Sequence, residues 1–273
     1  MEQPISEPDP ECVKHYRTLF ISDIHLGTRA CQAEAFLDFF KHHSAETIYL
    51  VGDIVDFWCI RRRGAYWPQS QNDVIQKLLR RVRKGTRMIY IPGNHDEALR
   101  EYCGMHFGGV EFVRNAVHVT ADGRRFVVMH GDEFDVVVRY SKWLAILGDW
   151  AYEIALGLNT YFNIIRRIIG MPYWSLSAYL KHKVKSAVSF IGEFETALAG
   201  EAERENANGI ICGHIHHATI EDINGVTYIN TGDWVESCTA VGETFEGEFE
   251  IIRWVNTLHQ KHNAKRKDIE ALA

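Results

Sequence analysis

The sequence has few of the features that mark secreted, disulfide-stabilised or membrane-spanning proteins. No stretch of about eighteen uncharged apolar residues is present, which argues against a membrane-spanning helix. The first fifteen residues are acidic and contain proline, with no apolar run of the kind that a secretory signal needs. We therefore expect a cytoplasmic protein. None of the cysteines forms a C-x-x-C pair, so we expect reduced thiols rather than a disulfide framework or a thiolate zinc site: Cys12, Cys31, Cys59, Cys103, Cys212 and Cys238.

An excess of basic charge is also lacking. The 273 residues include 30 Lys and Arg against 36 Asp and Glu, which gives a net charge of −6. An acidic chain is a poor general binder of the phosphate backbone, so we expect no nucleic-acid partner. With 46% hydrophobic residues, the chain has ample material for a globular core, and a largely disordered protein is excluded.

Short apolar runs alternate with helical patterns along the first half of the chain. Strands are predicted at residues 18–22, 47–51, 87–91 and 126–129, with helices at 32–42 and 74–84. This alternation predicts an α/β fold in which helices cover a sheet and ligands gather beyond the carboxyl ends of the strands. The strand pattern returns at 209–212, 219–223, 226–230 and 249–255.

The alternation is interrupted by a segment with helical spacing of large apolar residues such as Trp143, Leu147 and Trp150. We therefore predict a core of residues 16–135 and 206–257, a helical insertion at 136–205 and a polar tail at 258–273. The aromatic residues of the insertion fit two interpretations. Helical apolar spacing favours packing between helices, whereas their basic neighbours, among them Arg166 and Arg167, favour contact with a membrane surface.

Five short polar motifs follow predicted strands. Each alone is more typical of a turn or a helix cap, but five in succession at strand ends indicate one shared site. Imidazole and carboxylate together favour Mn, Fe, Zn or Co over a calcium-type oxygen cage. Within D-x-H and H-x-H, residues two apart in an extended segment face the same way. The motifs are Asp23-Ile24-His25, Gly52-Asp53-Ile54-Val55-Asp56, Gly93-Asn94-His95-Asp96, His130-Gly131-Asp132 and Gly213-His214-Ile215-His216.

In this order and over roughly residues 18–235, these motifs resemble the signature of the calcineurin-like metallophosphoesterases. The resemblance implies a four-layer α/β/β/α sandwich, with the helical insertion as a lid, and two divalent metal ions. It implies that one ion is held by Asp23, His25, Asp53 and His216, and the other by Asp53, Asn94, His130 and His214.

The resemblance also implies roles for the remaining polar residues of the motifs. His95 would protonate the leaving group or bind the phosphate, and Asp96 would orient it. Asp56 and Asp132 would set the geometry of imidazoles or of the backbone.

Within this family the chain is most similar to the bacterial UDP-2,3-diacylglucosamine pyrophosphatases of lipid A synthesis. Its size, its helical insertion and the sequence Asn230-Thr231-Gly232-Asp233-Trp234 carry that similarity. It implies hydrolysis of a nucleotide-linked glycolipid to UMP and 2,3-diacylglucosamine 1-phosphate, with Mn²⁺ as the expected metal. Acyl chains would enter the insertion, which would contact the inner-membrane surface. Lys181 and Lys185 are candidates for phosphate binding, against the alternative of a solvated helix face.

One position departs from the narrower group, and three other functions compete. His95 stands where the best-known lipid A enzymes commonly carry Arg, although His is the general pattern of the superfamily. A broader phosphodiesterase or phosphomonoesterase would share every ligand. A nuclease is disfavoured by the acidic charge, and a non-catalytic module would be expected to have lost ligands.

Overall fold

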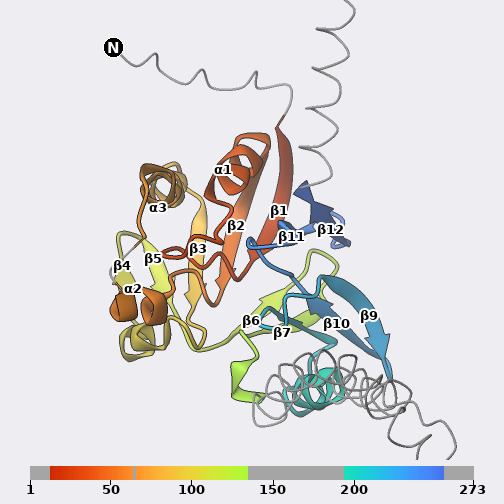
Figure 1. The fold of residues 1–273 in the computed structure, drawn as a ribbon. Coiled ribbons are helices and arrows are strands. Elements are labelled where there is room, and N and C mark those ends of the chain that lie inside the picture. The colour runs from red at the N-terminus through yellow and green to blue at the C-terminus, as the bar shows by residue number, and fades with distance from the viewer. Residues whose placement is uncertain (1–12, 64–65, 135–193, 255–273) are drawn as a thin grey trace, which may run out of the picture. The chain divides into compact units, whose positions relative to one another are not determined.

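The computed structural model describes residues 13–63, 66–134 and 194–254 (Figure 1). The chain divides into two compact units, one formed by Met1–Asp132 with Glu201–Ala273 and the other by Glu133–Gly200. Residues 194–204 are helical. The rest of the insertion predicted at 136–205, with Lys181 and Lys185, lies outside the described residues, as does the tail predicted at 258–273. No helix in the described part of the chain is both long and apolar enough to span a bilayer.

A mixed seven-stranded sheet forms the larger layer of the first unit. Its order is β12-β11-β1-β2-β3-β5-β4, in which β1, β2, β3 and β5 are parallel to one another and β11 and β4 run antiparallel to their neighbours. The strands are β1 (Lys14–Ile21), β2 (His43–Val51), β3 (Arg87–Ile91), β4 (His106–Phe107), β5 (Val110–Phe112), β11 (Thr239–Glu243) and β12 (Phe249–Arg253).

A five-stranded sheet forms the second layer, in the order β6-β7-β8-β10-β9. Its three central strands are parallel, and the edge strands β6 and β9 pair antiparallel. The strands are β6 (Ala116–Val119), β7 (Arg125–Val128), β8 (Gly209–Cys212), β9 (Thr219–Ile223) and β10 (Val226–Asn230).

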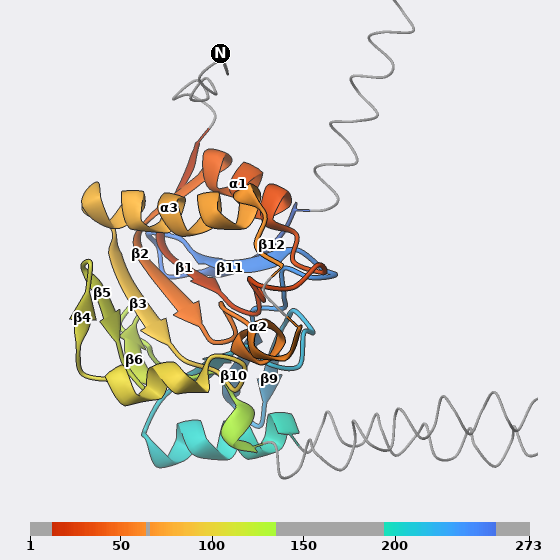
Figure 2. The same ribbon diagram turned by 60° about the vertical axis from the view of Figure 1, so that its left-hand side comes forward.

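Helices α1 (Ala33–His42) and α3 (Gln69–Arg83) lie along one face of the seven-stranded sheet (Figure 2). In α1 the buried side chains of Phe36, Phe39 and Phe40 recur at the i, i+3 and i+4 spacing that places them on one side of a helix. In α3, Val74 and Leu78 are buried at the same spacing. Helix α2 (Phe57–Arg63) and the 3₁₀ turns η2 (Glu97–Tyr102) and η3 (Asp132–Phe134) lie in the loops after strands.

Two hydrophobic cores hold these layers together. One lies between α1, α3 and the seven-stranded sheet and includes Phe36, Leu78 and Trp234. The other lies between the two sheets, where Phe20 and Ile89 meet Phe126 and Ile211. The predicted α/β sandwich of facing sheets is therefore confirmed. Because β1, β2, β3, β7 and β8 each end just before one of the five motifs, the two parallel strand sets deliver all five to the rim of the sandwich.

Candidate metal centre

The loops after β1 and β2 run side by side and are held by backbone hydrogen bonds. The amide of Asp23 donates to the carbonyl of Gly52 at 3.0 Å, and that of His25 donates to Asp53 at 2.9 Å. This pairing gives the two loops a fixed register. Their side chains do not alternate as in a strand, because Asp23 and His25 both adopt a left-handed backbone with φ of 52°. Neither has the extended backbone that we predicted from the D-x-H spacing.

Left-handed backbone is shared by five of the seven predicted ligands. Besides Asp23 and His25, φ is 55° for Asp53, 72° for His214 and 55° for His216. A residue with a Cβ atom adopts this region at a cost of about 1–2 kcal/mol, and such strain is concentrated at functional sites. These positions sacrifice local stability for side-chain placement.

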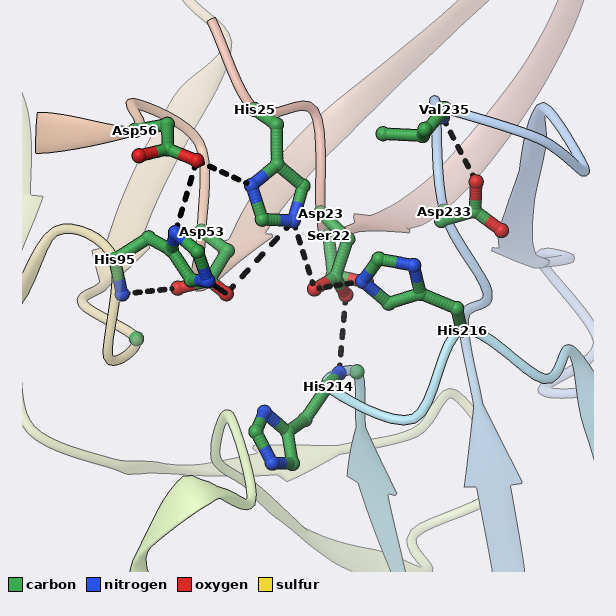
Figure 3. Close-up of polar contacts among 12 residues, drawn as sticks. Ser22, Asp23, His25, Asp53, Asp56, His95, His214, His216, Asp233 and Val235 are labelled. Carbon is green, nitrogen blue, oxygen red and sulfur yellow. Dashed lines mark hydrogen bonds and ion pairs between the residues drawn. The ribbon is translucent and has the colours of Figure 1, made fainter. Parts of the chain in front are cut away.

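The first predicted ligand group comes together around Asp23, which is fully buried (Figure 3). Its Oδ1 lies 3.1 Å from Nε2 of His216 and 3.8 Å from Nε2 of His25. Among the described residues, Nε2 of His25 is buried with no hydrogen-bond partner. A buried polar nitrogen without a partner costs free energy unless it finds a hydrogen bond or a metal ion. A cation between these three atoms would be such a partner.

The second predicted group forms around His130, which is buried between the two sheets' loops. Its Nε2 lies 3.4 Å from Oδ2 of Asp53 and 3.3 Å from Oδ1 of Asn94. Its other nitrogen, Nδ1, lies 2.9 Å from the carbonyl of Val51, which fixes the ring with Nε2 toward the carboxylate. The ring of His214 stands at 5.1 Å from that of His130.

Asp53 reaches both groups. Its Oδ2 lies 3.4 Å from Nε2 of His130 and 3.9 Å from Nε2 of His25, while its Oδ1 accepts a hydrogen bond from the amide of His95 at 2.8 Å. The ligand atoms of Asp23, His25 and His216, and separately those of Asp53, His130 and His214, lie within 4.8 Å of one another. Mixed carboxylate and imidazole donors at this spacing fit a pair of divalent cations that share Asp53.

The electrostatics of the protein alone are those of a cation site. Burial by itself would lower the pKa of His130, but the charges of Asp53 and Asp23 outweigh it and raise that pKa to about 10. Burial by itself would raise the pKa of Asp53, but its contacts with His130 hold that pKa below its usual range. A metal ion bound to Nε2 of His130 would compete with a proton there, so metal binding would release that proton.

Asp56, rather than Asp96, contacts the ring of His95. Oδ2 of Asp56 lies 2.9 Å from Nδ1 of His95 and 3.3 Å from Nδ1 of His25 (Figure 3). Burial would raise the pKa of Asp56, but the hydrogen bonds from these two rings hold it well below its usual range. One carboxylate therefore orients two imidazoles, and both present Nε2 to Asp53 at 3.9 Å.

Asp96 has a different place from the one we predicted. Its Oδ1 accepts from the amide of Gly93 at 2.6 Å, and its Oδ2 accepts from the amide of Ile54 at 2.9 Å and the hydroxyl of Tyr90 at 2.5 Å. Burial and the charge of Asp53 raise the pKa of Asp96. Through these hydrogen bonds the carboxylate of Asp96 ties the loops after β2 and β3 together. The carboxylate that contacts the ring of His95 is that of Asp56.

Glycine is required at Gly52 and Gly93, because a Cβ there would lie 2.1 Å from Nδ1 of His130 and 2.3 Å from Oδ1 of Asp53, respectively. Two other features of the site were not predicted from the sequence. Asp132 pairs with Arg100. The ring of Trp58, a partly exposed residue of α2, stands 4.3 Å from that of His95.

The sequence Asn230–Trp234 supports the site from behind. The amide of Trp234 donates to the carbonyl of Asp23 at 2.9 Å, and the hydroxyls of Ser22 and Thr231 lie 2.6 Å apart. The carboxylate of Asp233 accepts from the amide of Val235 at 2.8 Å and so closes its own loop (Figure 3).

Comparisons with known proteins agree with this geometry. The model of the calcineurin-like phosphoesterase family matches residues 16–218. A UDP-2,3-diacylglucosamine hydrolase from Aliivibrio fischeri is 25% identical over 227 residues, which cover 79% of this chain and 90% of the relative. One from Haemophilus influenzae is 26% identical over 255 residues, or 88% and 100% of the two chains.

Among solved structures, the phosphoesterase Yfce from E. coli aligns with 86% of this chain and 98% of its own, at 12% identity and a TM-score of 0.41. The family match spans most of the chain, and the described residues include His and Asp groups that can hold the divalent cations the family implies. The chain therefore belongs to the calcineurin-like phosphoesterase family, and it is a hydrolase.

Proposed function

We propose that this protein is an Mn²⁺-dependent hydrolase that cleaves the pyrophosphate of UDP-2,3-diacylglucosamine to UMP and 2,3-diacylglucosamine 1-phosphate. The observation that carries the proposal is the position of Asp53, whose Oδ2 lies within 4 Å of an imidazole nitrogen from each ligand group. The substrate is supported by the relatives, which are UDP-2,3-diacylglucosamine hydrolases and are covered by this chain over 90% and 100% of their length.

The residues of the site divide the work. Asp23, His25 and His216 would hold one ion, Asn94, His130 and His214 the other, and Asp53 both. Two such ions would supply positive charge to the phosphate oxygens and acidify a water molecule. The contact of Asp56 with Nδ1 of His25 leaves Nε2 of that ring available for the first ion, and the contact of the Val51 carbonyl with Nδ1 of His130 leaves its Nε2 available for the second.

In the proposed reaction His95 gives a proton to the leaving group. Its Nδ1 is held by Asp56, and its Nε2 faces the same space as Asp53. The side chain is 22% exposed, so a substrate can reach it. An imidazole whose far nitrogen contacts a carboxylate is a good proton donor and acceptor near neutral pH.

We propose that the insertion at 136–205 receives the acyl chains. It would act as a lid and contact the inner-membrane surface. The aromatic residues and basic side chains of that segment support this role. Lys181 and Lys185 remain proposed phosphate contacts.

The contact between His95 and Asp56 favours a second candidate, a phosphodiesterase acting on esters of ordinary alcohols. A nucleotide phosphate leaves as a stable anion near neutral pH, whereas an alkoxide requires a proton from a general acid. An imidazole at this position therefore has more to contribute to ester cleavage than to anhydride cleavage.

One assay separates the two candidates. The purified full chain with Mn²⁺ would be given UDP-2,3-diacylglucosamine and, in parallel, an alkyl and a 4-nitrophenyl phosphodiester. We expect release of UMP, with a smaller loss in His95→Ala on the anhydride than on the alkyl ester. Turnover of the esters alone would overturn the glycolipid assignment and leave the second candidate.

A further inference from the structure

Arg100 and Asp132 form an ion pair between two loops of the site. Nη2 of Arg100, in η2, donates to both carboxylate oxygens of Asp132, at 2.7 and 2.6 Å. The side chains are 23% and 9% exposed, so the pair is largely removed from water. A charge-assisted contact with this geometry and burial is stronger than a solvated ion pair.

The two partners flank ligands of the same group. Asp132 lies two residues after His130, and Arg100 lies six residues after Asn94. Nη2 of Arg100 is also 3.5 Å from the carbonyl of Pro92, at the start of the loop that carries Asn94. Arg100 therefore spans both loops, and across the same gap Oδ1 of Asn94 stands 3.3 Å from Nε2 of His130.

The Arg100–Asp132 ion pair joins these two loops directly. The loop of Asn94 is tied to the loop after β2 through Asp96, and His130 is tied to Val51. Beside the contact between Asn94 and His130 themselves, the Arg100–Asp132 pair therefore sets the loop of Asn94 against the loop of His130.

We propose that Arg100 is a positioning residue for the second metal group, which acts through Asp132 to hold Asn94 and His130 at ligand spacing. This inference rests on the proposed function only in taking that group as a metal site. Outer contacts of this kind commonly change metal affinity 10–100-fold when removed.

Electrostatics and positioning predict opposite signs for one substitution. Arg100→Gln removes a positive charge near the site, and by charge alone a cation should then bind more tightly. If Arg100 positions the ligands, the same substitution weakens binding of the second ion. The sign of the change therefore identifies the role.

The test is calorimetric titration of the full chain with Mn²⁺ alone, together with kinetics and the thermal midpoint. We expect two Mn²⁺ ions per wild-type chain. In Arg100→Gln one of the two ions should lose 10–100-fold in affinity, with the other ion within twofold of wild type. Arg100→Lys, which keeps a donor and the charge, should recover most of the affinity. At saturating Mn²⁺, KM should stay at the wild-type value.

Arg87→Gln is the matched control, because Arg87 also makes two hydrogen bonds to one carboxylate, that of Glu111. Arg87 begins β3, at the opposite end of the strand from the loop of Asn94, and its side chain is 58% exposed. We expect both Mn²⁺ affinities of this variant within twofold of wild type.

Several results would overturn the proposal. Tighter or unchanged Mn²⁺ binding in Arg100→Gln would do so, and a raised KM beside it would make Arg100 a substrate contact. A lower thermal midpoint with both affinities intact would leave a structural role only. Fewer than two ions on the wild-type chain would remove the second site itself. Because the titration contains no substrate, failure to cleave the glycolipid would sink the proposed function and leave this inference standing.

Discussion

Two buried clusters of carboxylate and imidazole lie in the same unit and have opposite designs. In the metal centre, Nε2 of His25 is buried without a hydrogen-bond partner among the described residues, and Asp23 and Asp53 both approach it within 4 Å. In the second cluster, by contrast, the neighbouring polar groups all contact one fully buried carboxylate, that of Glu243 at the end of β11.

The Glu243 cluster closes on itself. Oε1 of Glu243 accepts from Nη1 of Arg17 at 2.6 Å and from the amide of Ala121 at 2.9 Å, and Oε2 lies 2.8 Å from Nε2 of His118. Arg17 belongs to one sheet and His118 to the other, so the cluster joins the layers. A structural polar cluster thus satisfies its own hydrogen-bonding groups, whereas a binding cluster leaves some of them unsatisfied and tolerates backbone strain to place them.

The largest expected effect is on catalysis, from Asp53→Asn. The amide keeps the shape but loses the charge that both ligand groups share. We expect kcat/KM to fall by at least ~10³, the upper end for one electrostatic group in an active site. The fold should remain, as circular dichroism would check. Wild-type turnover in this variant would contradict the role given to Asp53.

The converse experiment is Glu243→Ala. It leaves a buried imidazole and the Arg17 guanidinium without their carboxylate, and we expect a loss of about 3 kcal/mol in the free energy of unfolding. Denaturant titration measures it. In the folded fraction, kcat/KM should stay within a few-fold of wild type. A loss of activity without a loss of stability would break the comparison.

Mn²⁺ should stabilise the folded protein through the metal centre and not through the Glu243 cluster. At an Mn²⁺ concentration of 100 times the dissociation constant, binding to the folded state adds about 2.7 kcal/mol per site. We expect a higher thermal midpoint for the wild type and for Glu243→Ala, reversed by a chelator. Asp53→Asn should show a much smaller rise. An equal rise in all three proteins would place the Mn²⁺ elsewhere.

The smallest effect concerns acid. Burial alone would raise the pKa of Glu243, but hydrogen bonds from His118 and Thr18 hold it below its ordinary value of 4.5. A carboxylate with a depressed pKa stabilises the fold above its unfolded value, and this stability is lost as the pH falls through the folded value.

We therefore expect the wild type to lose its advantage in unfolding free energy over Glu243→Gln as the pH falls below 4.5. This advantage can change by at most ~1.4 kcal/mol per pH unit for one proton. Urea titrations at several pH values measure it, and an advantage independent of pH would contradict the assigned ionisation.

The strands that carry the motifs were predictable because each contains a short, mostly apolar run. Residues 47–51 and 87–91 fall within β2 and β3, whereas β11, Thr239–Glu243, was missed. Its sequence TAVGE contains Gly242 and a buried acid, and neither is typical of a buried strand. Gly242 is needed there because a Cβ would lie 2.4 Å from the ring of Tyr16. Such a requirement comes from a distant strand and leaves no local pattern.

The choice between Asp56 and Asp96 shows the same limit inside the site. Asp96 directly follows His95 in the chain, whereas Asp56 belongs to the preceding motif. Asp96 was therefore the partner that the sequence predicted. The turn after β3 instead directs Asp96 to the amides of Gly93 and Ile54. Asp56 arrives from another loop to contact the ring.

By itself the sequence determined which residue types follow each strand, since hydrophobic runs and the glycines, acids and histidines after them are local. Those were enough for the α/β class and for the choice of candidate ligands. Which oxygen meets which nitrogen was decided only when β1, β2, β3, β7 and β8 were brought together in two facing sheets. Left-handed backbone at Asp23, His25 and Asp53, and the pairing of Arg100 with Asp132, depend on neighbours far away in the chain. Strain and long-range ion pairs exist only where packing overrules local preference, and packing is a property of the whole fold.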